Sequence, residues 1–149
     1  MPVGRYVYRM PHTVPESETV RTAAQLMERE SVGCVVLVED GRPVGMLTDR
    51  DIALRILGHK LDPSVVSVGE LARRPPIVVS AQASLAEAVR VMRLQRVRWL
   101  LVVDPVGKLM GVLCVDDVLR AHSSEVAQLG EALRTQLSGP AAREPEHPR

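Results

Sequence analysis

The chain has 149 residues, of which 46% are apolar and only 2% aromatic, so it can hold one domain, or two small ones, around an aliphatic core. A formal net charge of +1 argues against a protein that binds nucleic acid or an anionic membrane through bulk charge. Two cysteines are too few for a disulfide framework, and neither a signal peptide nor a membrane-spanning run is evident, so we expect a cytoplasmic protein.

The first half of the chain predicts a strand, a helix, two strands and a second helix. In chain order we expect a lead-in segment over residues 3–10, a short strand over 12–14, a helix after Thr19, strands over 34–38 and 44–47, and a helix over 49–57. Val20, Ala23 and Met27 follow the helical spacing of a buried stripe. The run over 34–38 is apolar at every position, which is typical of a strand buried on both faces.

The second half repeats this order. The expected elements are a lead-in segment over 68–74, a short strand around Val79, a helix with a capping box of Ser84 and Glu87, strands over 99–103 and 109–113, and a helix over 116–122. Leucines at four-residue spacing predict a further amphipathic helix within 126–137. We therefore divide the chain into a first repeat (3–60), a linker (61–67), a second repeat (68–123), a C-terminal helix (124–138) and a disordered tail (139–149).

Two stretches carry the repeat most clearly. GMLTDRDI over 45–52 matches GVLCVDDV over 111–118, with Asp117 at the position of Asp51. The two halves stay in one register, apart from one extra residue in the turn of the second hairpin, where insertions are tolerated. This is the pattern of a tandem repeat.

The stretch GMLTDRDI is also the best candidate for a binding site. It predicts a strand that passes at Thr48 into the first turn of a helix, where backbone N–H groups lack partners and can hold an anion. Thr48 adds a hydroxyl, and the Asp51 carboxylate can accept hydrogen bonds from a diol such as ribose. The alternative is structural, because Thr-x-x-Asp is also a helix-capping pattern.

The tandem unit, with Gly-hydrophobic-hydrophobic-Thr-x-x-Asp near its end, resembles a pair of CBS domains, or Bateman module, over residues 3–122. GMLTDRDI followed by LDPSVVSVGELA is especially similar to small stand-alone bacterial proteins of this kind. The resemblance implies an α/β (α+β) fold of two pseudo-symmetric strand-helix-strand-strand-helix repeats packed through their sheets. It also implies two clefts that bind AMP, ADP, ATP or S-adenosylmethionine, or in some members no known ligand, and two chains stacked as a disc of four repeats.

The resemblance assigns residues to each cleft, which we name after its aspartate. In the Asp51 cleft, Asp51 would contact the ribose and Thr48 the phosphate. The full set implied for the Asp51 cleft is Met46, Thr48, Arg50, Asp51, Ile77, Arg98 and Trp99, with Met46 and Ile77 against the base. The set implied for the Asp117 cleft is His12, Gly33, Cys34, Val112, Cys114 and Asp117.

Two of these positions depart from the family pattern. Cys114 stands where Thr or Ser is usual and solvates a phosphate poorly, and Trp99 stands where the second repeat often has Arg. We therefore expect one nucleotide per chain, in the Asp51 cleft. A minor alternative is that Cys34, Cys114 and His12 form a thiol pair or a metal site, although this set is one ligand short of a closed zinc site.

These features predict a regulatory module rather than an enzyme. The histidines are scattered and no nucleophile stands at a suggestive spacing from a base, so we expect no catalytic residue, no metal and no obligatory cofactor. An adenosine nucleotide is the candidate ligand, read by an unknown regulated protein; the alternative is a ligand-free interaction scaffold. Because one pair cannot cover its apolar helical surface, we expect a homodimer through the helices that begin at Thr19, Asp49, Ser84 and Asp116. Three further arginines, Arg90, Arg93 and Arg96, are interpreted as a solvated helix face.

Overall fold

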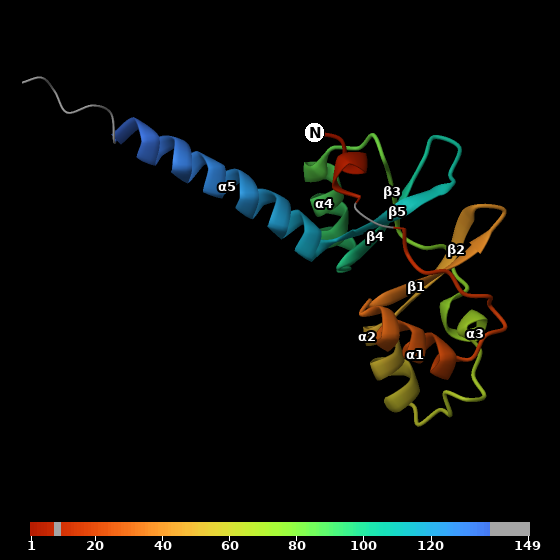
Figure 1. The fold of residues 1–149 in the computed structure, drawn as a ribbon. Helices are drawn as coiled ribbons and strands as arrows, with labels where there is room; N and C mark the ends of the chain where they lie inside the picture. The colour runs from red at the N-terminus through yellow and green to blue at the C-terminus, as the bar shows by residue number, and fades with distance from the viewer. Residues whose placement is uncertain (8–9, 138–149) are drawn as a thin grey trace, which may run out of the picture.

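The computed structural model describes residues 1–7 and 10–137 and contains two small sheets with helices packed against them (Figure 1). The first repeat contains η1 (Val3–Tyr6), α1 (Val20–Glu30), β1 (Cys34–Glu39), β2 (Arg42–Thr48), α2 (Asp49–Asp51) and η2 (Ile52–Leu57). The second contains α3 (Val68–Ala72), β3 (Val78–Ser80), α4 (Leu85–Gln95), β4 (Trp99–Val103), β5 (Leu109–Cys114) and α5 (Val115–Leu137). The predicted tail over 139–149 lies outside the described residues, as do positions 8 and 9 of the lead-in segment.

Each repeat builds its sheet around an antiparallel hairpin. β1 pairs with β2, beginning with Cys34 opposite Thr48. β4 pairs with β5 in the same way, and β3 adds a parallel strand beside β4. In the first repeat, the strand expected over 12–14 is reduced to a single parallel bridge between Thr13 and Val36. The two repeats therefore share one plan, with the first sheet one strand smaller.

The helices begin and end where the sequence supplies caps. The hydroxyls of Thr19 and Ser84 each accept a hydrogen bond from the N–H three residues on, at 3.2 and 3.1 Å. For Ser84 this is one half of the capping box that the sequence predicts. Both α1 and α4 end at a residue in the left-handed conformation, Ser31 (φ 53°) and Arg96 (φ 55°). The chain thereby turns into the central strand at the same point in both repeats.

Three buried clusters hold the molecule together. The cluster around Leu47 and Ile56 of the first repeat is completed by α3, and the cluster around Leu100 and Leu113 of the second repeat is completed by η1. A third, smaller cluster joins the two sheets. Its buried members are Cys34 and Val36 of β1, Leu101 of β4 and Val112 of β5. The repeats thus pack through their sheets, and the mixed α/β fold expected from the sequence is confirmed.

The helices that follow the two hairpins differ from the prediction. In the first repeat, the helix expected over 49–57 is one α-helical turn, α2, continued by the π-helical η2. In the second, the helices expected over 116–122 and 126–137 are a single helix, α5, of 23 residues. No proline or glycine interrupts residues 115–129, and the Ser123 hydroxyl donates to the Leu119 carbonyl of the same helix at 2.8 Å.

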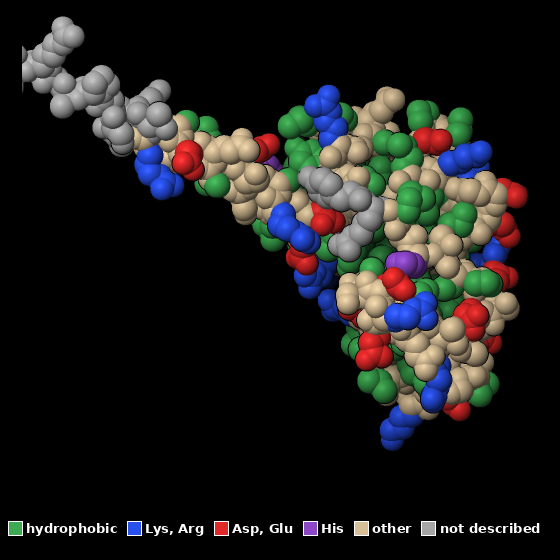
Figure 2. Space-filling view, viewed as in Figure 1, with side chains coloured by type: hydrophobic (Ala, Val, Ile, Leu, Met, Phe, Trp, Pro, Cys, Tyr) green, Lys and Arg blue, Asp and Glu red, His purple; other side chains and the backbone are tan. Residues whose placement is uncertain are grey.

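Beyond its first turns, α5 stands clear of the body (Figures 1 and 2). Its residues from 122 to 129 are all exposed to solvent. Among the described helices none, α5 included, is both long and apolar enough to cross a membrane.

Candidate functional site

The turn from β2 into α2 is closed by its own side chains. The Thr48 hydroxyl accepts a hydrogen bond from the Asp51 N–H at 3.1 Å, and Oδ2 of Asp51 accepts one from the Thr48 N–H at 3.0 Å. This is the reciprocal capping box that Thr-x-x-Asp predicts. Oδ1 of Asp51 instead faces Arg74, with its guanidinium 3.7 Å away. The Asp51 side chain is 24% exposed, so one oxygen caps the helix while the other remains accessible.

The glycine that opens GMLTDRDI has a packing role. Gly45 forms an isolated bridge with Arg73, just after α3, and a side chain at Gly45 would collide with the carbonyl oxygen of Ala72. The absence of a Cβ therefore allows α3 to lie against β2. This contact also fixes the start of the segment that follows α3. That segment forms one wall of the cavity beside the capped turn.

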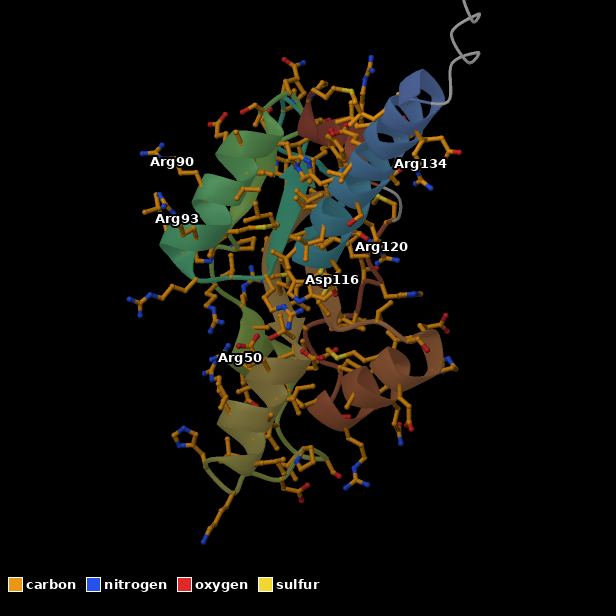
Figure 3. All side chains as sticks on the ribbon, turned by 90° about the vertical axis from the view of Figure 1, so that its left-hand side faces the viewer. Arg50, Arg90, Arg93, Asp116, Arg120 and Arg134 are labelled. Atoms are coloured by element: carbon orange, nitrogen blue, oxygen red, sulfur yellow. The ribbon has the colours of Figure 1, made fainter. Side chains whose placement is uncertain are left out.

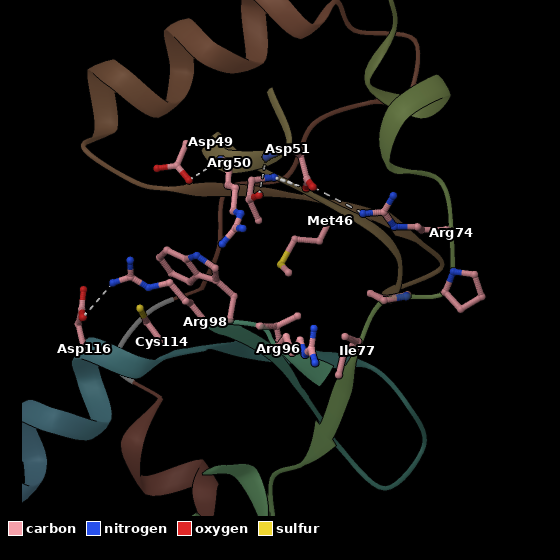
Figure 4. Close-up of a pocket in the computed structure, with 15 residues that line it drawn as sticks. Met46, Asp49, Arg50, Asp51, Arg74, Ile77, Arg96, Arg98, Cys114 and Asp116 are labelled. Atoms are coloured by element: carbon pink, nitrogen blue, oxygen red, sulfur yellow. Dashed lines mark hydrogen bonds and ion pairs between the residues drawn. The ribbon is translucent and has the colours of Figure 1, made fainter. Parts of the chain in front are cut away.

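A cavity of about 650 Å³ opens beside the capped turn, with walls from both repeats (Figure 4). The residues predicted for the Asp51 cleft all line it, namely Met46, Thr48, Arg50, Asp51, Ile77, Arg98 and Trp99. Those up to Asp51 belong to β2 and α2, and the rest come from the second repeat. The volume falls within the range of roughly 300–1,000 Å³ that is usual for small-molecule sites.

The structure adds residues that the sequence analysis did not assign to this cleft. Arg74 lines it from the segment after α3, and Arg96 from the end of α4. Arg96 is exposed to solvent, as predicted, but it also lines the cleft, whereas the side chains of Arg90 and Arg93 point outward from α4 (Figure 3). The other added lining residues are Asp49, Pro75, Pro76, Val97, Cys114 and Asp116.

Arginines dominate the charge of the Asp51 cleft. Its lining includes four arginines against three aspartates. Arg74 pairs with Asp51 at 3.7 Å, and Arg98 pairs with Asp116 at 3.4 Å. Neither Arg50 nor Arg96 forms a side-chain ion pair with another described residue. The cleft therefore holds cationic side chains without fixed counter-charges.

A second cavity, of about 390 Å³, occupies the position of the Asp117 cleft. Five of the six residues predicted for that cleft line it: His12, Gly33, Cys34, Val112 and Cys114. Asp117 itself does not. Asp117 is only 8% exposed, and its carboxylate accepts hydrogen bonds from the Cys114 N–H and from Arg120, both at 3.3 Å. The turn and Arg120 thus hold the side chain away from the cavity, and Asp116 lines it instead.

Trp99, Cys114 and Asp116 line both cavities and so form the wall between them. A Cβ at Gly33 would lie 2.9 Å from the indole ring of Trp99, so glycine makes room for the ring at that position. Burial, as the main cause, raises the pKa of the Cys114 thiol, which favours the neutral form at physiological pH. A neutral thiol is a poor nucleophile and metal ligand. Within the described residues, no group of three or more His, Cys, Asp or Glu side chains is arranged to hold a metal ion.

The family model of the CBS domain matches the chain twice, over residues 3–58 and 68–124. The chain belongs to the CBS domain family. Its two matches confirm the tandem pair that the repeat predicts. Both cavities lie at the junction of the two CBS domains, since each is lined by residues of both.

Relatives of known structure share this fold. Hypoxic response protein 1 of Mycobacterium tuberculosis is 39% identical over 108 residues, which cover 72% of this chain and 75% of that protein. A solved structure of hypoxic response protein I, with two coordinated zinc ions, has a TM-score of 0.69 at 33% identity, covering 81% of this chain and 98% of that one. A CBS domain protein of Pyrobaculum aerophilum, solved in complex with AMP, has a TM-score of 0.75 at 31% identity, covering 86% and 99%.

Proposed function

We propose that this CBS pair is a regulatory module, not an enzyme, that binds one adenosine nucleotide per chain in the Asp51 cleft and signals its presence to a partner protein. The observation that carries the proposal is the combination of an accessible Asp51 carboxylate with four arginines in one cavity. A carboxylate can accept hydrogen bonds from a ribose diol, and guanidinium groups bind phosphate oxygens in pairs of parallel hydrogen bonds.

The rest of the Asp51 cleft suits an adenine base. Its apolar lining residues are Met46, Pro75, Pro76, Ile77, Val97 and Trp99. An apolar wall with a few placed polar groups is the usual make-up of a small-molecule site. The Pyrobaculum aerophilum relative in complex with AMP supports an adenosine nucleotide as the ligand class.

Charge distinguishes the two cavities. The positions equivalent to Arg50, Arg96 and Arg98 in the opposite repeat hold Asp116, Ser31 and Gly33. Among the described residues, the lining of the second cavity therefore has one arginine, Arg120, which is paired with Asp117, and two carboxylates, Glu30 and Asp116. An anionic nucleotide is repelled there and attracted to the Asp51 cleft. This supports the expectation of one nucleotide per chain.

Binding can be tested by a thermal shift screen with AMP, ADP, ATP and S-adenosylmethionine, followed by titration calorimetry. Ligand at about a hundredfold excess over its dissociation constant stabilises the folded state by roughly 2.7 kcal/mol. We expect a shift with at least one nucleotide and a stoichiometry of one per chain. If no adenosine compound shifts the transition, the capping box is only structural and the ligand-free scaffold is the better description. Two equivalent sites per chain would contradict the asymmetry.

We also propose that the CBS pair forms a homodimer through its helices. The large exposed apolar side chains include Leu54 and Leu57 of η2, Val89 and Leu94 of α4, and Leu119 near the start of α5. Elements α2 and α4 lie on the same side of the molecule (Figures 1 and 3). Apolar groups gathered on one side favour burial against a second copy. Helix α1, although included in the prediction, adds no large exposed apolar side chain to this set.

Light scattering at tens of micromolar should give a mass of twice the 16.3 kDa chain. The double variant Leu54→Glu with Leu94→Glu should be monomeric at the same concentration, because it places charges in the apolar surface. Val106→Glu is the matched control, since Val106 is equally exposed but lies in the turn between β4 and β5. A monomeric parent protein, or a dimer that survives the double substitution, would refute this interface.

A further inference from the structure

We infer that the Asp51 cleft selects a nucleoside di- or triphosphate over a nucleoside monophosphate, and rejects the cationic S-adenosylmethionine. This inference rests on the proposed function and narrows its ligand class.

The four arginines reach the cavity from three separate segments of the chain. Arg50 lies on α2, Arg74 follows α3, and Arg96 and Arg98 lie in the connection from α4 to β4. The close-up shows them on different sides of the cavity (Figure 4). A single terminal phosphate is compact and meets one or two guanidinium groups. A chain of two or three phosphates extends through more of the cavity and can meet groups on several sides.

The ion pairs of the arginines also favour a ligand with more than one phosphate. Arg50 and Arg96 form no side-chain ion pair with any other described residue, so a ligand can supply their counter-charges. Arg98 is paired with Asp116, but both side chains are more than half exposed. Pairs as exposed as this contribute little, so the guanidinium can turn to a phosphate at small cost.

Arg74 is coupled to the ribose site. It contacts the same Asp51 oxygen that remains free after capping. A ribose hydroxyl bound to this oxygen competes with the guanidinium of Arg74, which lies 3.7 Å away without a hydrogen bond and can turn to a new anionic partner. A phosphate of the same ligand can fill that role, so occupation of the two subsites is linked.

The same arrangement disfavours S-adenosylmethionine. Its sulfonium would enter a cavity lined by four arginines and three aspartates, two of which are already paired with arginines. Like charges within a few ångströms in a partly desolvated cavity repel strongly. The cation gains no free carboxylate in exchange except Asp49, whose Oδ1 accepts the Arg50 N–H at 2.8 Å.

Titration calorimetry with AMP, ADP, ATP and S-adenosylmethionine tests the inference on the parent chain, without magnesium. We expect ATP to bind at least about tenfold more tightly than AMP, ADP to fall between them, and S-adenosylmethionine to give no measurable heat. ATP affinity should also fall more steeply with added salt than AMP affinity, because more charges are paired.

A pair of double variants assigns the effect to the cleft. Arg50→Gln with Arg96→Gln should reduce the preference for ATP over AMP to about twofold or less, because the two unpaired cations are removed. Arg90→Gln with Arg93→Gln makes the same charge change on the exposed face of α4 and should keep the full preference. Circular dichroism and thermal unfolding establish that both variants fold.

The outcomes separate the inference from the proposed function. If AMP or S-adenosylmethionine binds as tightly as ATP, the ligand class inferred here is wrong while nucleotide sensing stands. The inferred ligand class is also wrong if the α4 control variant loses the preference for ATP over AMP as fully as the cleft variant does. If no adenosine compound binds, both the proposed function and the inference fail.

Discussion

Replacing Asp51 with alanine is expected to weaken nucleotide binding by roughly 10- to 150-fold, the equivalent of about 1.5–3 kcal/mol for a hydrogen bond to a charged group. The oxygen of this carboxylate that does not cap the helix lies 3.7 Å from Arg74, and Asp51 lines the cleft in which we propose that it accepts from the ribose. Titration calorimetry with the tightest-binding nucleotide measures the loss. An Asp51→Ala variant that binds like the parent would show that the carboxylate serves only its own helix.

Asp117→Ala is the matched control, because Asp117 makes the same kinds of contact from the equivalent position. Each carboxylate caps its turn through one oxygen and faces an arginine with the other. Both substitutions should therefore lower the free energy of unfolding, by about 0.5–2 kcal/mol for the lost cap. Only Asp51→Ala should also lose nucleotide. Binding lost in Asp117→Ala alone would contradict this prediction, because it would place the ligand in the second cavity.

Leu101→Ala is expected to cost about 2–5 kcal/mol of unfolding free energy, which is a large share of the stability of a small domain. Leu101 is fully buried in the cluster that joins the two sheets. The cluster has few other buried members, so few neighbouring side chains can move into the space that the alanine leaves. Urea denaturation measures the change. Nucleotide affinity should fall as well, because the clefts depend on how the two CBS domains are held together.

The control for this prediction is Leu129→Ala. Leu129 lies on the part of α5 that stands clear of the body and is 66% exposed. Removing its side chain should change the unfolding free energy by no more than about 0.5 kcal/mol. If the two substitutions cost the same, the cluster between the sheets is not a core of this protein.

The parts of the fold that were predictable from the sequence are those with a local signal. The stripe of Val20, Ala23 and Met27 marks α1, and all three side chains are buried. The apolar run that begins at Cys34 marks β1, which extends one residue beyond the prediction. The register of the repeat then transfers each assignment to the second half. Such signals lie within a few neighbouring residues and survive without tertiary information.

What could not be predicted depends on contacts between distant segments. The exposure of Asp51 and the burial of Asp117 differ, although their motifs match, because Arg120 pairs with Asp117 from the next turn of a longer helix. In the sequence Arg96 looks like one member of a basic helix face. Its backbone is in the left-handed conformation, however, and its side chain lines the cleft. The repeat offers a partial signal for Arg74, since Arg9 stands at the equivalent position in the first half.

The long α5 helix begins in the wall between the two cavities and ends far from it. Its first turn includes Asp116, which lines both cavities and pairs with Arg98. A helix of 23 residues is about 34 Å long, so any change in its direction at the cavities is enlarged at its far end. A rotation of about 10° at the base would move the far end by about 6 Å, slightly more than the rise of one helical turn. Under the proposed function, a change in the Arg98–Asp116 ion pair on ligand binding is thus placed to shift the far end of α5.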